Sequence, residues 1–202
     1  MIKNIIFDIG NVLMPFQYRR FFESFGYDKE IVERLSKATA QSPDWNELDR
    51  GVLSYEEVLE RFIQRAPELR EIILQVFSDL HDILDVYDYT MPWIHQLKSA
   101  GYGVYYLSNF FQKAAEDCKD LMGFLGLMDG GILSYQDKVI KPDASIYRLL
   151  LERYGLKAEE CVFLDDTERN IAGAEKNGIH GILFQSREQA VTELQKLGIN
   201  TK

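Results

Sequence analysis

The stretch IIFDIGNVL, residues 5–13, begins as an apolar run, delivers one carboxylate, Asp8, and then turns through Gly10. An apolar run of this kind is typical of a strand that is buried on both faces of a sheet. Such a strand tolerates an acid poorly, because an unpaired charge is costly to remove from water. We therefore expect Asp8 to meet a metal ion, a cation or a reacting group.

The residues that follow this strand change to a helical pattern. Residues 16 to about 85 show helical periodicity, punctuated by glycines and prolines. The clearest helix is SYEEVLERFIQ, in which Ser54 and Glu57 form the signature of a capping box and the apolar residues make one face. This part of the chain is predicted to be a helical insertion.

From about residue 90 onward, helical and strand patterns alternate. Helices are expected at 91–100, 110–121, 143–154 and 168–177, and strands at GVYYLSN, near GGILSY, at CVFLDD and at GILF, with a final helix. The alternation predicts right-handed crossovers and a parallel sheet covered on both faces. The expected fold class is α/β, with a Rossmann-like core made of residues 1–14 and 89–202 and a helical insertion at residues 15–88.

Composition restricts the possible partners and the compartment. The chain has 202 residues, with 23 Lys and Arg against 32 Asp and Glu, and a formal net charge of −9. A field of this sign repels nucleic acid and anionic membranes, so neither is expected as a partner. Cys118 and Cys161 lie far apart and lack metal-ligand spacing, which favours reduced core thiols and a cytoplasmic protein. The sequence leaves open whether the chain is a monomer or a homodimer.

Polar residues follow the predicted strands, at the edge of a parallel sheet where ligands bind. They are Asp8, Ser108 and Asn109, Lys141 in VIKPD, and Asp165 and Asp166 after CVFL. Each alone is explained by a helix cap, a turn or a solvated loop. Together, the carboxylates suit Mg²⁺ shared with a phosphate, with Lys141 as the counter-charge and Ser108 as a hydrogen-bond donor. A carboxylate beside a phosphate can attack it, so Asp8 is the candidate nucleophile.

The motifs FDIGNVL, LSN, KPD and FLDDTERNIAGA, in this order and with a helical insertion after the first, resemble those of the haloacid dehalogenase superfamily of hydrolases. The resemblance implies that residues 15–88 form a cap over the site. It also implies these roles: Asp8 as nucleophile, Ser108 and Asn109 on the phosphoryl group, Lys141 as its clamp, and Asp8, Asp165, Asp166 and the carbonyl of Gly10 as ligands of Mg²⁺. The opening motif is most similar to a subgroup of sugar-phosphate phosphatases that includes bacterial α-D-glucose-1-phosphate phosphatase.

One position departs from the pattern of the family's phosphatases. Most of them carry a second Asp two residues after the nucleophile, where it protonates the leaving group and then activates water, whereas this chain has Gly10. A general acid-base group is typically worth about 10²- to 10⁴-fold in rate. The sequence therefore predicts a preference for leaving groups that need little protonation, such as those of sugar 1-phosphates and of acyl or aryl phosphates. This preference would not hold if Glu47, Asp49 or water transferred the proton to the leaving group instead.

Two alternatives compete with a Mg²⁺-dependent phosphatase of small phosphorylated metabolites. Dehalogenases of the superfamily also lack the second Asp, need no metal, and carry non-acidic residues where this chain has Asp165 and Asp166. Without Mg²⁺ these two carboxylates would repel Asp8, with mainly Lys141 to compensate, which favours the phosphatase. A non-catalytic member that binds phosphometabolites or a protein partner is supported by Gly10 alone.

The stretch from Trp45 through NELDRG is expected to be a loop between helices of the insertion. Such a loop could hang over the site. A solvated position is the favoured interpretation for Glu47, Asp49 and Arg50, and contact with substrate is the alternative.

Overall fold

The computed structural model describes residues 1–201. At its centre lies a five-stranded parallel sheet with the strand order β3-β2-β1-β4-β5. The strands are β1 (Asn4–Phe7), β2 (Gly103–Ser108), β3 (Gly130–Leu133), β4 (Cys161–Asp165) and β5 (His180–Leu183). The predicted α/β class with a Rossmann-like core is confirmed. Because β1 lies between β2 and β4, the residues that follow these three strands meet at one edge of the sheet.

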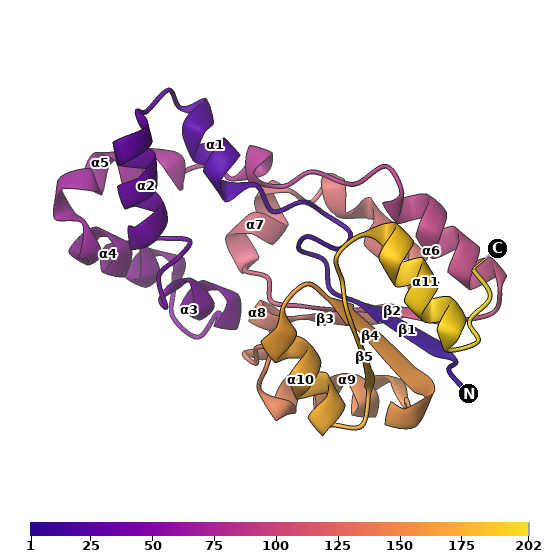
Figure 1. Ribbon diagram of the computed structural model, residues 1–202. Coiled ribbons are helices and arrows are strands. Elements are labelled where there is room, and N and C mark those ends of the chain that lie inside the picture. The colour runs from indigo at the N-terminus through magenta and orange to yellow at the C-terminus, as the bar shows by residue number, and fades with distance from the viewer. Residues whose placement is uncertain (202) are drawn as a thin grey trace.

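Helices cover both faces of the sheet (Figure 1). On one face lie α6 (Thr90–Ser99) and α11 (Arg187–Lys196), and on the other α9 (Ala144–Tyr154) and α10 (Glu168–Lys176). Alternate residues of β1 supply the two apolar cores, because successive side chains of a strand point to opposite faces. Ile5 and Phe7 pack with α6 and α11, whereas Ile6 packs with α9 and α10.

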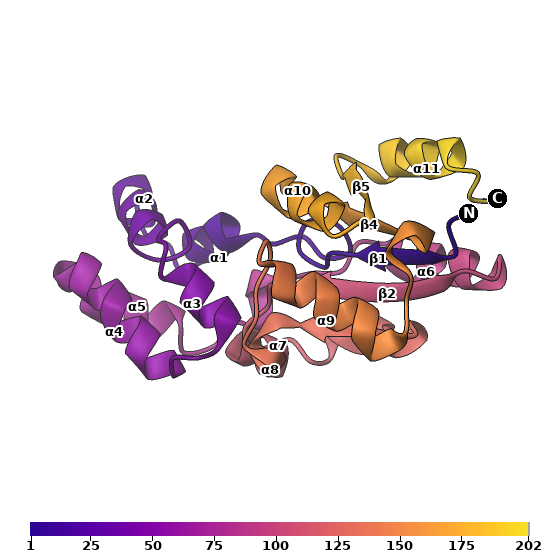
Figure 2. The ribbon, with the colours of Figure 1, turned by 90° about the horizontal axis from the view of Figure 1, so that it is seen from below.

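Five helices form a separate helical lobe, residues 18–76, beside the carboxyl edge of the sheet. They are α1 (Tyr18–Ser24), α2 (Lys29–Ala38), α3 (Trp45–Arg50), α4 (Tyr55–Arg65) and α5 (Arg70–Val76). Both chain termini lie at the opposite end of the molecule, as Figure 2 shows. The predicted capping box of α4 is confirmed, because Ser54 and Glu57 exchange both of its hydrogen bonds.

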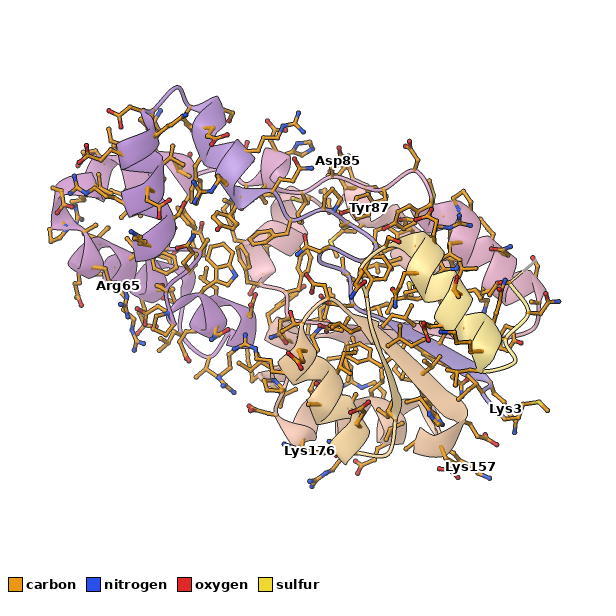
Figure 3. The ribbon with its side chains drawn as sticks, viewed as in Figure 1. Lys3, Arg65, Asp85, Tyr87, Lys157 and Lys176 are labelled. Carbon is orange, nitrogen blue, oxygen red and sulfur yellow. The ribbon has the colours of Figure 1, made fainter. Side chains whose placement is uncertain are left out.

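Two connections join the helical lobe to the sheet, and they run side by side. Phe16 on the outgoing connection forms an antiparallel bridge with Leu84 on the returning one. The returning connection continues through Asp85 and Tyr87, which are labelled in Figure 3. The lobe is therefore held to the core at a narrow junction as well as by its side-chain contacts.

The remaining elements are short. They are α7 (Gln112–Asp117), α8 (Ser134–Asp137) and the 3-10 turns η1 (Pro67–Leu69), η2 (His81–Ile83), η3 (Leu121–Leu127) and η4 (Ala158–Glu160). The helix predicted at 110–121 was placed too broadly, since α7 ends at Asp117 and a 3-10 segment containing Gly123 and Gly126 follows. Glycine weakens a helix because it loses more backbone entropy than other residues.

The expectation of a loop at residues 45–50 was wrong, because these residues form helix α3. Trp45 packs against aromatic rings of both the lobe and the core, and Leu48 is buried. Gly51 ends the helix in the left-handed conformation, with φ of 63°, a conformation that glycine adopts without a steric penalty.

Both cysteines are free and buried, as predicted. Burial raises the pKa of the Cys118 and Cys161 thiols, which keeps them protonated. Within residues 1–201, the longest apolar helical segments fall short of what is needed to cross a membrane.

Candidate active site

Asp8 directly follows β1 at the carboxyl edge of the sheet and is 7% exposed. Its backbone N–H donates to the carbonyl of Leu164 in β4, at 2.8 Å. Its carboxylate Oδ1 accepts hydrogen bonds from the Ser108 hydroxyl and from the N–H of Ile9, both at 2.7 Å. The same oxygen lies 2.8 Å from Nζ of Lys141. These three donors offset part of the cost of desolvating the carboxylate.

Lys141 is the buried cation of the site. Its side chain is 1% exposed, and Nζ lies 2.8 Å from Asp8 and 2.6 Å from Asp165. Burial by itself lowers the pKa of Lys141, but the two carboxylates outweigh it and hold the pKa above its ordinary value. The ammonium therefore stays charged and binds two strand ends together.

The side chain of Asn109 positions Lys141. Its Oδ1 accepts a hydrogen bond from the N–H of Lys141 at 2.7 Å, and its Nδ2 donates to the carbonyl of Lys141 at 3.1 Å. Both ends of the amide are thus occupied by the backbone of the residue that precedes Pro142. The structure places Asn109 beside the predicted clamp, while its contact with a phosphoryl group stays a prediction.

Asp165 and Asp166 stand at the end of β4, and their surroundings differ. Asp165 is fully buried, and both of its oxygens accept hydrogen bonds from Nδ2 of Asn170 at 3.0 Å. Asp166 is more accessible and accepts a hydrogen bond from Nδ2 of Asn11 at 2.9 Å. One oxygen from each of Asp8, Asp165 and Asp166 lies within 4.8 Å of the other two.

This donor set fits Mg²⁺, which prefers carboxylate and carbonyl oxygens and keeps part of its water shell. Burial raises the pKa of Asp8 to about 7, with Lys141 opposing the shift and Asp165 adding to it. A bound cation would favour the ionised form of such a carboxyl group. Asp8, Asp165, Asp166 and the carbonyl of Gly10 are the residues that would hold the metal, and their roles stay predictions.

Gly10 leaves open space beside the candidate nucleophile. It lines a cavity together with Asp8 and Asp166. A Cβ atom added at Gly10 would meet no atom of the described residues within 4 Å, and Gly10 is not among the glycines with positive φ. The position two residues after Asp8 therefore has room for a side chain but holds none.

Two adjoining cavities open onto Asp8, with volumes of about 190 Å³ and about 650 Å³. The walls of the smaller one are largely apolar and include Phe16, Trp45, Ile83, Leu84, Phe110 and Phe111. The larger one adds the polar side chains Gln41, Ser42, Asn46 and Arg169. A ligand bound at Asp8 could thus extend either into the smaller cavity, with its apolar walls, or into the larger one, with its polar side chains.

Asp49 is a site residue that the sequence analysis assigned to a solvated loop. It lies on α3, is 7% exposed and lines both cavities. Its carboxyl group has no hydrogen-bond or ion-pair partner among residues 1–201. Burial raises the pKa of Asp49 to about 8, partly opposed by Lys141 and reinforced by Asp8. The glycine stop at Gly51 and the helical spacing of Trp45 and Leu48 were the signals for a helix here.

Asn11 also belongs to the site and was not predicted. It adopts a positive φ of 57°, donates to Asp166 and accepts a hydrogen bond from the N–H of Phe16 at 3.1 Å. The Gly-Asn pair that follows Asp8 and Ile9 is a turn signal that could have drawn attention to it. Asn11 links the acidic cluster to the connection that leads into the helical lobe.

Comparison with known proteins identifies the family. Residues 2–178 match the haloacid dehalogenase-like hydrolase family. The chain therefore belongs to the haloacid dehalogenase-like hydrolases. Membership of a hydrolase family is consistent with a site in which the carboxylate of Asp8 lines a cavity at the end of a strand.

Three individual proteins illustrate the similarity. Acyl-CoA dehydrogenase family member 10 of Mus musculus is 28% identical over 96% of this chain, which spans 19% of the mouse protein. A phosphorylated carbohydrates phosphatase of Thermotoga maritima is 27% identical over 88% of this chain and 82% of its own length. A HAD family enzyme from Bacteroides thetaiotaomicron, in complex with magnesium and inorganic phosphate, superposes with a TM-score of 0.70 at 22% identity, over 93% of this chain and 96% of that chain. The last comparison supports the fold.

Proposed function

We propose that the protein is a Mg²⁺-dependent phosphatase of small phosphorylated metabolites that forms an aspartyl-phosphate on Asp8. The observation that supports this most is the pairing of a buried carboxylate, Asp8, with a buried ammonium, Lys141, next to two further carboxylates. This arrangement offers a nucleophile, a cation for phosphate oxygens and an oxygen site for a metal. The relatives that are phosphatases agree with it.

In the proposed reaction, an oxygen of Asp8 attacks the phosphorus atom of a bound phosphate monoester. In this reaction the third N–H of the Lys141 ammonium, which contacts Asp8 and Asp165 with the other two, donates to a phosphoryl oxygen, and the Ser108 hydroxyl turns its one hydrogen from Asp8 to another. Asn109 keeps Lys141 in position through the two hydrogen bonds to its backbone. Mg²⁺, when bound, supplies positive charge beside the phosphoryl oxygens.

The acidic cluster favours a phosphatase over a metal-free dehalogenase. Three carboxylates approach one another within 4.8 Å, and the ammonium of Lys141 contacts two of them. Like charges at such distances disfavour one another's ionised forms. A divalent cation relieves this repulsion, whereas a dehalogenase without metal would have to tolerate it.

We further propose sugar phosphates, such as sugar 1-phosphates, as substrates. The polar lining of the larger cavity suits a body rich in hydroxyl groups, and the Thermotoga relative is a phosphatase of phosphorylated carbohydrates. In this proposal residues 15–88 are the cap and residues 1–14 and 89–202 the catalytic core, since α3 of the helical lobe lines the cavities beside Asp8. The cytoplasmic location and the monomer or homodimer state stay predictions.

The test is hydrolysis of p-nitrophenyl phosphate by purified protein with Mg²⁺ and with EDTA, followed by a screen of phosphorylated metabolites. We expect activity that depends on Mg²⁺ and is absent from an Asp8→Asn preparation made in parallel. Full activity in EDTA would contradict the metal site. Release of halide from 2-haloacids by metal-free protein would replace the proposal with the dehalogenase, and binding of phosphometabolites without turnover would support the non-catalytic alternative.

A further inference from the structure

We infer that Asp49, on helix α3 of the helical lobe, is the general acid-base residue of this site and does the work of the acid that Gly10 lacks. The inference rests on the proposed phosphatase function. It concerns a residue that lies 41 positions from Asp8 in the chain and belongs to a different part of the fold. Four features of the structure lead to it. The backbone of Asp49 is hydrogen-bonded to the core, its side chain is buried, its carboxyl group has no hydrogen-bond or ion-pair partner among residues 1–201, and the space at Gly10 is open.

The backbone around Asp49 is held to the core by hydrogen bonds. The Ser134 hydroxyl, at the start of α8, donates to the carbonyl of Asp49 at 2.6 Å, and the Lys138 ammonium donates to the carbonyl of Gly51. The neighbouring Arg50 reaches Asp143 at 3.3 Å, two residues beyond Lys141. The position of Asp49 relative to Asp8 is therefore set by contacts with the core, as a group that exchanges protons with a substrate requires.

Among residues 1–201, the carboxyl group of Asp49 makes no hydrogen bond or ion pair that would stabilise the fold. A buried carboxyl normally has hydrogen-bond partners, as Asp165 has in this protein. Asp49 is 7% exposed and lacks such partners among the described residues, yet it lines both cavities that open onto Asp8. A buried polar group left unpaired reduces stability, so its position is better explained by a group that it meets during turnover.

The protonation state agrees with this role. Burial raises the pKa of Asp49 to about 8, with Lys141 opposing and Asp8 reinforcing the shift. The group therefore holds a proton at neutral pH and can donate it. A general acid works best when its pKa lies near the pH at which the enzyme operates.

The proposed cycle balances in protons and bonds. In the first step an oxygen of Asp8 forms a bond to phosphorus, the bond from phosphorus to the leaving oxygen breaks, and that oxygen takes the proton of Asp49 to leave as an alcohol. In the second step the Asp49 carboxylate takes a proton from water as the water oxygen attacks phosphorus. The bond to Asp8 then breaks, inorganic phosphate leaves, and both aspartates return to their starting states.

The experiment compares two substrates of similar body and different leaving group, p-nitrophenyl phosphate and benzyl phosphate, in wild type and Asp49→Asn. Benzyl alcohol is a far weaker acid than p-nitrophenol, so its departure needs a proton. We expect kcat/KM to fall about 10²- to 10⁴-fold for benzyl phosphate and at least ten-fold less for p-nitrophenyl phosphate. The parameter kcat/KM reports the steps up to transfer of the phosphoryl group to Asp8, so it isolates the role of Asp49 as an acid.

The same variant tests the role of Asp49 as a base. With p-nitrophenyl phosphate, Asp49→Asn should form the aspartyl-phosphate and hydrolyse it slowly. The expected signature is a burst of p-nitrophenolate close to one equivalent per enzyme, followed by a slow steady state. A residue with a merely structural role would not produce such a burst.

Two further variants make the test specific. Glu47→Gln, on the same helix but partly exposed and near Arg50, is the matched control and should leave the ratio of the two substrates unchanged. Adding Gly10→Asp to Asp49→Asn should restore benzyl phosphate hydrolysis at least ten-fold, because the space at Gly10 accepts a side chain.

The outcomes separate this inference from the proposed function. If wild-type protein hydrolyses neither substrate, the phosphatase proposal fails. If wild type is active but Asp49→Asn loses the same factor on both substrates, or loses nothing on benzyl phosphate, Asp49 is not the acid and the inference is overturned. The same conclusion follows if Glu47→Gln reproduces the selective loss.

Discussion

The carboxyl edge of the sheet and helix α3 each bring a buried carboxyl group to the same cavities. At the sheet edge, Asp165 is held by Lys141, by Asn170 and by the N–H of Thr167 at 2.8 Å. On α3, Asp49 is nearly as deeply buried and has no such partner among residues 1–201. Hydrogen bonds and a nearby cation favour the charged form of a buried carboxyl group, whereas burial without them favours the protonated form, as it does for Asp49.

This difference suggests that the two regions have different tasks: the sheet edge pairs charges, and helix α3 holds a proton. At the sheet edge, the contacts of the Lys141 ammonium with Asp8 and Asp165 hold β1, β4 and the Lys141 loop together. Helix α3 contributes Asp49, whose raised pKa of about 8 keeps it protonated at neutral pH and which we propose as the acid. The following predictions test this difference, beginning with the largest effect.

Asp8→Asn should abolish turnover and leave the fold intact. The amide keeps the shape of the side chain but lacks the anionic oxygen that attacks phosphorus. Lys141 would still have Asp165 as a partner at 2.6 Å. Steady-state hydrolysis and thermal unfolding of the variant check both statements, and a substantial fraction of wild-type activity in a contamination-free preparation would exclude Asp8 as the nucleophile.

Removal of divalent metal by EDTA should stop activity, and Mg²⁺ should restore it. Of the two strand-end carboxylates, Asp166→Ala should raise the Mg²⁺ concentration needed for half-maximal activity more than Asp165→Ala does. Asp166 is the more accessible residue, whereas the oxygens of Asp165 are already used by Lys141 and Asn170. Titration of activity with Mg²⁺ measures this, and the opposite order would assign the metal contact to Asp165.

Lys141→Met should lower the free energy of unfolding by about 3–5 kcal/mol, because it leaves buried carboxylates without their cation. The loss should shrink as the pH falls below about 7, the pKa of Asp8, because a protonated carboxyl group no longer needs the cation. Urea unfolding at several pH values measures it. Lys3→Met is the control, since Lys3 pairs with Glu160 at the exposed amino end of the sheet (Figure 3) and should have a far smaller effect. Equal losses for the two variants would mean that the buried pairing contributes little.

Asp49→Asn should stabilise the protein relative to wild type as the pH rises. The unfolded chain releases the Asp49 proton above the ordinary pKa of 3.8, while the folded protein holds it up to a pKa of about 8. Wild-type stability therefore falls over this range, and the asparagine variant escapes this loss. The difference in unfolding free energy between variant and wild type should grow by about 2–4 kcal/mol from pH 5 to pH 8. Urea unfolding in EDTA tests this, and a difference that does not change with pH would show that Asp49 is ionised in the folded state.

Arg50→Ala should have the smallest effect. Arg50 joins α3 to the core through Asp143 at 3.3 Å, but this pair is partly exposed and Arg50 is not among the residues that line the two cavities. Exposed pairs contribute at most about 1 kcal/mol. We expect a correspondingly small change in stability and an unchanged ranking of substrates, and a changed ranking would place Arg50 at the substrate.

Much of the core and of the strand-end cluster followed from local sequence patterns. The alternation of apolar runs and helical periodicity predicted the parallel sheet. The carboxylates and Ser108 were recognisable because they stand at or just after the ends of buried strands, and Lys141 because of the VIKPD motif beyond the third strand. Their proximity then follows from topology: the register pairs Phe7 with Leu164, so Asp8 and Asp165 come next on adjacent strands. A carboxylate in an apolar strand stands out in sequence because it violates the pattern around it.

Tertiary structure alone decided the surroundings of Asp49 on helix α3 and of Asn109. Asp49 lies in a polar stretch, and its burial depends on contacts such as the one with Ser134, which is 85 residues away. The pKa of Asp49 is set chiefly by the removal of water, which no local pattern of residues reports. Likewise, Asn109 reads as a helix cap or a phosphate ligand in sequence, but the position of Lys141, 32 residues later, occupies its side chain. The sequence by itself thus determined which charges the sheet brings together, and only the packing of the helical lobe against the core decided which carboxyl group is left without a partner and able to hold a proton.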